Sequence, residues 1–255
     1  MKSLNQKVII LTVLILANVS FAGTYSGGDG SESQPYQIGN PGNWQELMTT
    51  PADWSSSFIL TADVNLAGVT LTPVGNSDTP FTGVFDGNHN KISNVVINQP
   101  GSNNVGLFGY VGGGQIRNLG VENVNMTGSY YVGGLVGENY GAVSNCYSTG
   151  SVSGGSGSYS VGGLAGQSGG TISDCNSTGT VSVSSDTWYV GGLVGDNEGT
   201  ISDCNSTGSV SGGSGSYFVG VIAGCSNWNV YRNCSLSAAD HLWIDQTTRW
   251  RIIYY

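Results

Sequence analysis

Charged side chains are scarce in this sequence, and positively charged ones are the scarcest. Charged residues make up 9% of the 255 residues, with 7 Lys and Arg against 16 Asp and Glu, which gives a formal net charge of −9. A helical bundle needs charged, helix-forming residues on its surface, so this composition excludes one. Nucleic acid is excluded as a partner because a protein that binds phosphates needs a basic surface.

Long apolar runs are lacking after the first residues. One apolar run covers residues 8–17, between Lys2 and Lys7 on one side and the small residue Ala22 on the other. This pattern is typical of an export signal, and the run is too short to span a bilayer. We therefore expect residues 1–22 to be a signal peptide and the product to be secreted, extracellular or held at the cell surface. No transmembrane anchor is expected in the mature chain.

Glycine, by contrast, is abundant, and much of it belongs to a repeat of 29 residues. The sequence holds 42 glycines. One glycine-rich block occurs four times at this spacing: VGGLVG at 132–137, VGGLAG at 161–166, VGGLVG at 190–195 and VGVIAG at 219–224. A second block follows at the same spacing: VSNCYSTGSVS from Val143, ISDCNSTGTVS from Ile172 and ISDCNSTGSVS from Ile201. ISNV from Ile92 and IRNL from Ile116 are interpreted as shorter, degenerate copies.

Each repeat holds short β-branched runs between Gly, Asn and Ser, and none has a helical period. Units that cannot bury a face alone must stack on their neighbours. Coils wound on one another place equivalent residues about 4.8 Å apart, the strand spacing of a sheet. The sequence therefore predicts an all-β fold, a right-handed parallel β-helix or β-solenoid. Its coils should hold Leu135, Leu164 and Leu193 in one inward file.

The ends of the array need caps, because a solenoid otherwise exposes unpaired strands. A short helix is expected from Asn43 to Met48, with Trp44 and Leu47 facing inward. The expected organisation is a signal peptide over 1–22, an N-terminal cap and first coils over 23–80, solenoid repeats over 81–235, and a C-terminal cap or truncated tail over 236–255.

The tetrads Gly-Leu-Val-Gly and Gly-Leu-Ala-Gly resemble the GLUG-motif repeats of bacterial secreted and surface β-helix proteins. Such repeats also occur beside immunoglobulin-A peptidase domains and in filamentous adhesins. The upstream stretch FTGVFDGNHNKISN (81–94) resembles the entry region of such β-helices. The resemblance implies a fold and a place outside the cell rather than an activity. The metalloprotease pattern H-E-x-x-H is absent from the sequence, so the peptidase chemistry is not carried over.

Cysteine occupies one repeat position in three coils. We assign to this slot Cys146, Cys175, Cys204 and, in earlier coils, Val95 and Leu119. The slot is then interior and apolar, and we expect buried thiols, because parallel Cβ vectors on stacked coils fit disulfide geometry poorly. Cys225 and Cys234 leave the register and are the better disulfide candidates. No histidine lies near the thiols, so neither a metal site nor a cofactor is expected.

Two carboxylates fall on adjacent coils, at Asp174 and Asp203. We assign them to a column otherwise made of asparagine, namely Asn94, Asn118, Asn145 and Asn233, which indicates a ladder of side-chain amides at a turn. A weak Ca²⁺ contact stays open, although two carboxylates fall short of the six to eight oxygens that Ca²⁺ takes.

Residues 166–170 match the G-x-S-x-G pattern of serine hydrolases. However, Ser168 takes a turn position that holds Asn in other repeats, and the hydrolase motif needs a strand-to-helix turn and a histidine partner. No catalytic residue is assigned.

Two outward columns are candidates for binding. The first is an aromatic file of residues 29 apart: Tyr130, Tyr159, Trp188 and Tyr217. Such rings stack on sugars or anchor a protein partner, or else they shield the strand ends and glycine corners beneath them. The second consists of two ranks of hydroxyls: Thr149, Ser151, Thr178, Thr180, Thr207 and Ser209. Flat hydroxyl ranks resemble ice-binding faces, and Ser and Thr are also ordinary strand-surface residues.

The sequence thus predicts a non-catalytic adhesion or binding module that meets a glycan or a surface protein through a repetitive solenoid surface. A carbohydrate-active β-helix enzyme, of the polysaccharide lyase or hydrolase type, is the main alternative, and it would need clustered carboxylates on one face. An ice-binding solenoid is a minor alternative. The oligomeric state and the ligand are left open.

Overall fold

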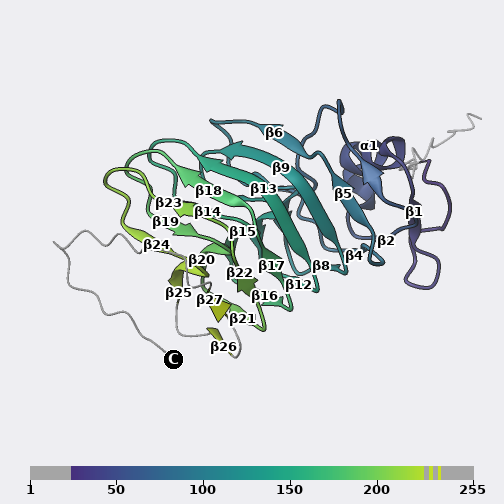
Figure 1. Ribbon diagram of the computed structural model, residues 1–255. Coiled ribbons are helices and arrows are strands. Elements are labelled where there is room, and N and C mark those ends of the chain that lie inside the picture. Colours follow the sequence, from purple (N-terminus) through teal and green to yellow (C-terminus); the bar gives the residue numbers. More distant parts are fainter. Residues whose placement is uncertain (1–23, 227–229, 232–234, 237–255) are drawn as a thin grey trace, which may run out of the picture.

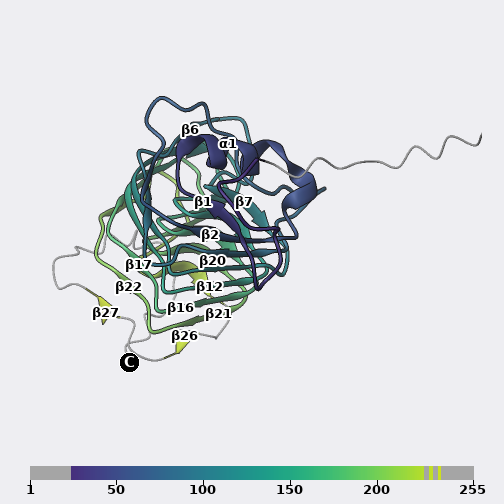
Figure 2. The ribbon, with the colours of Figure 1, turned by 90° about the vertical axis from the view of Figure 1, so that its right-hand side faces the viewer.

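Stacked parallel coils make up nearly all of the part of the chain that the structure describes. The computed structural model describes residues 24–226, 230–231 and 235–236 (Figure 1). Every strand pair in these residues is parallel, and the coils lie on one another when viewed from the end of the stack (Figure 2). The predicted all-β parallel solenoid is confirmed, with about 6 turns. The expected signal peptide lies outside the described residues, and the domain boundaries stay a prediction.

Two long sheets run along the stack. The first sheet has eight strands, in the spatial order β1 (Tyr36–Ile38), β2 (Ser57–Leu60), β4 (Val84–Asp86), β8 (Gln115–Arg117), β12 (Ala142–Ser144), β16 (Thr171–Ser173), β21 (Thr200–Ser202) and β26 (Val230–Tyr231). The second sheet has ten strands: β3 (Val64–Asn65), β5 (Lys91–Ser93), β9 (Gly120–Gly128), β13 (Tyr147–Gly154), β17 (Asn176–Ser177), β22 (Asn205–Ser206) and β27 (Ser235–Leu236), with β6 (Val96–Asn98) on β9 and with β18 (Thr180–Val183) joining β13 to β23 (Val210–Ser211).

Two shorter sheets close each coil. The third sheet holds β10 (Val132–Gly133), β14 (Ser160–Gly162), β19 (Tyr189–Gly191) and β24 (Phe218–Gly220). The fourth sheet holds β7 (Phe108–Val111), β11 (Val136–Asn139), β15 (Ala165–Ser168), β20 (Val194–Asn197) and β25 (Ala223–Ser226). From β10 onward a coil passes through all four sheets in turn before it returns to the first, whereas the described coils before β10 have no strand in the third sheet.

The 29-residue block is the unit that stacks in the central coils. Val143 of β12 pairs with Ile172 of β16, which pairs with Ile201 of β21. The three leucines predicted to face inward, Leu135, Leu164 and Leu193, are all 0% exposed. The predicted inward leucine file is confirmed.

The N-terminal coils have an aromatic core and a helical cap. Helix α1 (Pro41–Thr49) begins after Asn40, whose side-chain oxygen accepts a hydrogen bond from the Asn43 amide (3.1 Å) and so caps the helix. Trp44 and Leu47 are fully buried, as predicted, and the Trp44 ring packs edge-on against Phe85 and Phe108. A 3₁₀ turn, Pro51–Asp53, follows the helix. Across the described stretch of chain, no helix is long and apolar enough to cross a membrane.

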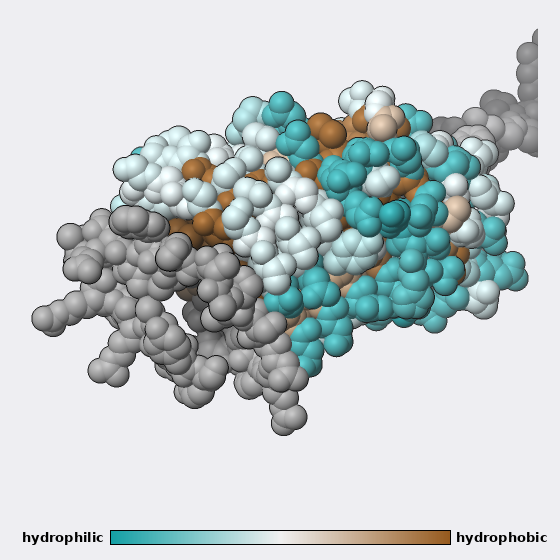
Figure 3. All heavy atoms as spheres, viewed as in Figure 1, coloured by the Kyte–Doolittle hydropathy of each residue, from teal (hydrophilic) through white to brown (hydrophobic). Residues whose placement is uncertain are grey.

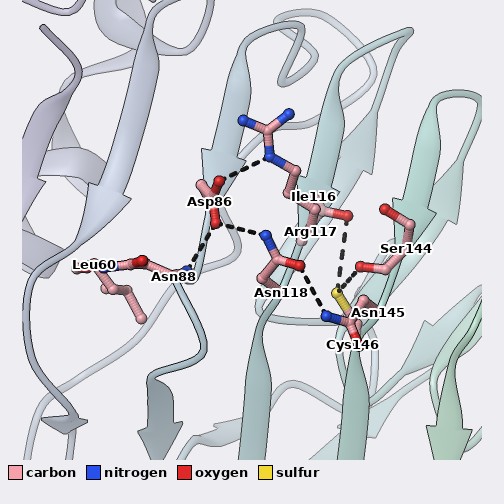
Figure 4. A network of polar contacts seen from close by, with 9 residues as sticks. All are labelled: Leu60, Asp86, Asn88, Ile116, Arg117, Asn118, Ser144, Asn145 and Cys146. Carbon is pink, nitrogen blue, oxygen red and sulfur yellow. Dashed lines mark hydrogen bonds and ion pairs between the residues drawn. The ribbon is translucent and has the colours of Figure 1, made fainter.

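Asparagine and aspartate turn the chain from the first sheet into the second. This corner has a left-handed backbone, which these two residues tolerate: Asn118 (φ 53°), Asn145 (φ 50°), Asp174 (φ 52°) and Asp203 (φ 53°). The Asn145 amide donates to Asn118 Oδ1 (2.8 Å), and the Asn118 amide donates to Asp86 Oδ1 (3.0 Å), as Figure 4 shows. The predicted amide ladder is present on these coils; Asn233 lies outside the described residues.

The placement of Asn94 in this ladder is wrong. Its side-chain amide donates instead to Asn65 Oδ1 (2.9 Å), and Asn123 donates to Asn94 Oδ1 (3.5 Å), at a second corner within the second sheet. Asn94 and Asn123 also have positive φ values, 58° and 53°. Because both corners need an inward apolar residue and a left-handed asparagine, the two local sequences look alike although they occupy different places in the coil.

Val95 is consequently also misplaced in the cysteine position. The Val95 carbonyl accepts a hydrogen bond from the backbone N–H of Asn125 (2.8 Å), at the second corner. The Leu119 carbonyl accepts one from the Tyr147 amide (3.0 Å), immediately after Cys146. Leu119 therefore shares the cysteine slot as predicted, and Val95 does not.

The three stacked cysteines are buried and form no disulfide. Each thiol lies within hydrogen-bonding distance of the carbonyl two residues before it: Cys146 to Ser144 (3.2 Å), Cys175 to Ser173 (3.0 Å) and Cys204 to Ser202 (3.1 Å). Hydrogen bonding with the Cys146 thiol, and burial, raise the pKa of the Cys175 thiol. The Cys175 thiol therefore stays protonated, and the three buried cysteines pack as small apolar residues. Cys234 lies outside the described residues, so its pairing with Cys225 stays a prediction.

The glycines of the repeated block allow the third and fourth sheets to approach closely. A methyl group on Gly162 would overlap the carbonyl oxygen of Ala165, three residues later, so the chain turns sharply between them. A methyl group on Gly166 would lie 2.5 Å from the backbone of Tyr131 in the preceding coil. At this edge of the solenoid the backbones of neighbouring segments are therefore in direct contact, because glycine has no side chain to separate them.

Gly162→Ala should lower the free energy of unfolding by more than about 2 kcal/mol, because a backbone carbonyl cannot move aside as a side chain can. Gly101→Ala is the matched control, since nothing lies within 4 Å of the methyl group it adds. Urea unfolding of both variants measures the difference. An equal, small effect of the two substitutions would contradict the close approach.

Candidate functional site

The predicted aromatic file lies on the surface at the entrance to the third sheet. Tyr130, Trp188 and Tyr217 are 43%, 44% and 62% exposed, and Tyr159 is half-buried. The rings stack in two pairs, Tyr130 on Tyr159 with centroids 6.2 Å apart and Trp188 on Tyr217 with centroids 4.6 Å apart. The structure therefore brings these four residues together as a file. Whether they bind a ligand stays a prediction.

A second aromatic row, which the sequence analysis missed, lies beside this file. It consists of Tyr131, Tyr189 and Phe218, each directly following a member of the file. Tyr189 pairs in register with Ser160 on one side and with Phe218 on the other. Ser160 occupies the equivalent position in the coil between Tyr131 and Tyr189. Because this position is not aromatic, the 29-residue periodicity of the row is interrupted in the sequence.

Tyr159 links the two rows. Its ring meets Tyr131 and Tyr189 edge-on, at centroid distances of 6.0 and 5.2 Å. Ser160, between these rings in the row, is fully buried. Edge-to-face contacts of this kind hold rings in defined orientations. The two rows therefore form one aromatic surface rather than separate columns.

A column of polar side chains runs along the fourth sheet, close to the second aromatic row. Its register partners are Tyr110, Glu138, Gln167, Asp196 and Cys225. Glu138 Oε2 accepts a hydrogen bond from the Asn104 amide (3.0 Å). Gln167 and Asp196 are only 6% and 7% exposed. Sequence reasoning missed this column because its members differ in type from coil to coil.

Two buried polar groups of this column lack hydrogen-bond partners in the part of the chain that the structure describes. The Oε1 atom of Gln167 is buried and receives no hydrogen bond. No donor to the Asp196 carboxyl is found among the described residues either, and the charged group that acts on it is Glu198. A buried polar group without a partner destabilises a fold, so these two acceptors mark a place where an external donor would be accommodated.

The acids of the polar column have no positively charged partner among the described residues. Burial, and then the nearby Glu198, raise the pKa of Asp196 to about 6. Burial also raises the pKa of Glu138. The Lys and Arg side chains among the described residues are Lys91 and Arg117, and they pair elsewhere.

Both of these cations belong to ion pairs away from the fourth sheet. Lys91 Nζ lies 3.0 Å from Glu122 Oε2, and Arg117 Nε lies 2.8 Å from Asp86 Oδ2. Lys91 is on β5 and Arg117 on β8, in the second and first sheets. Neither therefore neutralises the acids of the fourth sheet.

The hydroxyl ranks occupy a different face, on the second sheet. Ser151 pairs in register with Thr180, whose Oγ1 accepts a hydrogen bond from Ser209 Oγ (3.2 Å). Thr149 Oγ1 accepts a hydrogen bond from the backbone N–H of Asn123 (3.2 Å). Thr178 and Thr207 are exposed on the neighbouring coils. In the space-filling view, the surface over β9 and β13 is largely white and teal, so this face is polar (Figure 3).

The remaining candidates lie apart from the polar column. Ser168 is fully buried and accepts a hydrogen bond from the Asn139 amide (3.1 Å), which is a structural position and not that of an accessible nucleophile. Asp174 and Asp203 are exposed at the corner between the first and second sheets. In the part of the chain described, no group of three or more metal-ligating side chains is found.

The coils, the register and the glycine-dependent packing define a parallel β-solenoid repeat protein. The family model of the GLUG motif matches three of its repeats, at residues 128–153, 157–182 and 186–211. Each match begins before the third-sheet strand of its coil and so includes the close glycine contact.

About half of this chain is similar in sequence to parts of two much longer proteins. The sequence is 33% identical over 138 residues to "Halomucin" of Haloquadratum walsbyi, across 50% of this chain and 2% of that protein. It is 32% identical over 135 residues to "Putative Gly-rich membrane protein" of Evansella cellulosilytica, across 48% of this chain and 15% of that protein. The chain thus spans a small part of these relatives.

A solved structure shares the fold. It is a "putative immunoglobulin A1 protease" from Bacteroides ovatus, with a TM-score of 0.54 and 24% sequence identity, over 74% of this chain and 70% of that one. At this identity the similarity concerns the fold alone.

Asp196→Asn should change how stability depends on pH. Because the folded-state pKa, about 6, lies above the ordinary value of 3.8, the folded protein binds this proton more tightly than the unfolded chain does. The contribution of Asp196 to stability is therefore largest below pH 4 and is lost as the pH rises through 6. The variant should be more stable than the wild type by about 1–2 kcal/mol at pH 8.

Urea unfolding at several pH values between about 4 and 8 measures this difference. Asp174→Asn, which removes an exposed carboxyl at a different corner, is the control and should follow the wild type. An Asp196→Asn variant that is less stable than the wild type at pH 8 would show that the carboxylate is stabilised rather than strained.

Proposed function

We propose that the protein is a non-catalytic binding module of the cell exterior, whose aromatic file contacts a glycan or a surface protein. The observation that carries this proposal is the exposure of Tyr130, Trp188 and Tyr217 in a row along a rigid stack. Large aromatic rings are costly to leave in water, and an exposed row of them marks a contact surface. The expected export signal and the similarity to a protein named as a membrane protein support the location.

The file suits an extended, repetitive ligand. Adjacent coils are about 4.8 Å apart, so a chain laid along the stack meets one ring at each coil. Each contact is weak, and affinity comes from several engaged together. A repeat protein gains such sites simply by adding coils, which fits a role in adhesion.

An enzyme that cleaves carbohydrates is the second candidate, because Glu138 and Asp196 are partly desolvated acids on one face. Acids with raised pKa values are typical of general acid catalysis in glycoside hydrolysis. Gln167 lies on the coil between them, so their backbones are two coils apart, about 9.6 Å. This separation is wider than the about 5–5.5 Å between the carboxyls of a retaining glycosidase. Because Asp196 is buried and three rings of the aromatic file are exposed, we favour binding. Incubation of neutral polysaccharides with the protein should release neither new reducing ends nor unsaturated products, and their release would establish the enzyme instead.

Trp188→Ala should lower binding about five- to tenfold, since it removes a stacked ring at the centre of the file. A glycan array and an assay of attachment to cell surfaces measure binding, and thermal unfolding measures stability. The melting temperature should change by no more than about 2 °C, because the side chain is 44% exposed.

Val96→Ala is the matched control, an exposed apolar side chain on the second sheet that is 49% exposed. It should leave both binding and melting temperature unchanged. If Trp188→Ala lowers the melting temperature by several degrees and leaves binding intact, the file is packing for the glycine corners and the proposal fails.

A further inference from the structure

We propose that the second aromatic row and the polar column of the fourth sheet together bind a neutral glycan chain laid along the solenoid. The site is formed by Tyr131, Tyr159 and Tyr189 on one side, and by Glu138, Gln167 and Asp196 on the other. This inference rests on the proposed function and extends it, because it names the ligand class and the groups that would recognise its hydroxyls.

The aromatic side provides stacking surfaces in fixed positions. Tyr159 holds Tyr131 and Tyr189 edge-on, at centroid distances of 6.0 and 5.2 Å. Rings held in this way lose little further freedom when a ligand binds. The C–H faces of pyranose rings are apolar and stack on such rings.

The polar side provides acceptors that need donors. Gln167 Oε1 and the Asp196 carboxyl lie on adjacent coils, are more than nine-tenths buried, and receive no hydrogen bond from the described residues. Glu138, on the coil before Gln167, already accepts a hydrogen bond from the side-chain amide of Asn104. A ligand with one hydroxyl at each coil would supply the two missing hydrogen bonds, and sugar hydroxyls are donors of this kind.

The two sides are close enough to act on one ligand. A methyl group on Gly166, directly before Gln167, would lie 2.5 Å from the backbone of Tyr131. One on Gly195, directly before Asp196, would lie 2.9 Å from the backbone of Ser160, which is in the second aromatic row. The carboxyls of Glu138 and Asp196 also act electrostatically on the Tyr131 hydroxyl. Glu138, Gln167 and Asp196 are register partners on three successive strands. A chain that stacks on the tyrosines therefore runs beside the acceptors over three coils.

The charge of the face selects against acidic ligands. Glu138, Asp196 and Glu198 gather there, and the described Lys and Arg side chains pair elsewhere. A uronic-acid chain would add like charge in a desolvated place, which is unfavourable. The coil between Glu138 and Asp196 carries the neutral amide of Gln167. The face therefore offers a hydrogen-bond acceptor on each of the three coils without a charge on each, so a neutral ligand suffices.

The test compares three soluble oligosaccharide classes, each long enough to span three coils, by calorimetric titration against the full chain. The probes are neutral glucan, mannan and galactan oligosaccharides, a uronic-acid oligosaccharide and a glucosamine oligosaccharide. At about pH 8 we expect at least one neutral probe to bind and the uronic-acid probe not to bind. Failure of every neutral probe to bind would overturn the inference.

Two variants then test the acceptors. Asp196→Asn should weaken binding of the neutral probe about tenfold, because it replaces one oxygen of a charged acceptor with an NH2 donor at little change of shape. Gln167→Met should weaken binding several-fold, because it removes the acceptor Oε1. Asp196→Asn should at the same time improve binding of the uronic-acid probe. The control Asp174→Asn removes the same charge from another corner and should change neither.

The pH dependence gives an independent readout. The groups that face Asp196 are Glu198 just after its own strand, Gln167 on β15, Cys225 on β25, and the hydroxyls of Tyr131 and Tyr189. Because the ionised carboxyl is the stronger acceptor, affinity for the neutral probe should fall as the pH drops from about 8 to 5. In Asp196→Asn this fall should disappear.

The outcomes separate the inference from the proposed function. If Trp188→Ala weakens binding of the neutral probe and the Asp196 and Gln167 variants do not, the outer file binds the glycan and this inference is wrong. If a neutral probe binds and none of the three variants weakens it, both are wrong. If the glucosamine probe alone binds, the face recognises a cation and the assignment of a neutral chain fails.

Discussion

The hydrogen-bond ladder between coils is the constraint on which the rest of this structure depends. Each coil exchanges backbone hydrogen bonds with the coils on either side of it. Leu135 N–H donates to the Leu164 carbonyl (2.9 Å), and Leu164 N–H donates to the Leu193 carbonyl (2.8 Å). A side chain consequently lies over its equivalent one coil away, whatever its chemistry. Leucines, thiols, amides and aromatic rings each form files for this single reason.

This constraint explains the scarcity of charge. A like charge placed on the same position of successive coils would meet its copy about 4.8 Å away, which is unfavourable unless solvent screens it. The fourth sheet shows the consequence, since two desolvated acids, Glu138 and Asp196, are separated by the neutral Gln167. The stacked carboxyls Asp174 and Asp203, by contrast, are exposed. Solubility falls to Ser, Thr and Asn, which stack without cost.

The regular part of the fold could be predicted from the sequence, because a strict repeat determines which residues stack. The inward leucines, the buried cysteines and the helix carrying Trp44 and Leu47 all follow from spacing and burial. The register of the degenerate coils could not, because two corners of one coil share a local sequence. Asn94 was accordingly matched to Asn118 although they occupy different corners.

The candidate site was predicted in part for a related reason. Its outer file repeats in the sequence, whereas its second aromatic row is interrupted by Ser160 and its polar column changes type at each coil. A site assembled from unlike residues leaves no periodic signal, and only the register brings Tyr131 near Glu138 and Asp196.

Scalar couplings through hydrogen bonds, measured by NMR on the deuterated protein, test the register most directly. The account predicts couplings from the amide nitrogen of Leu135 to the carbonyl carbon of Leu164, and from that of Leu164 to Leu193. Couplings to carbonyls at another spacing would contradict the stacking of 29-residue coils.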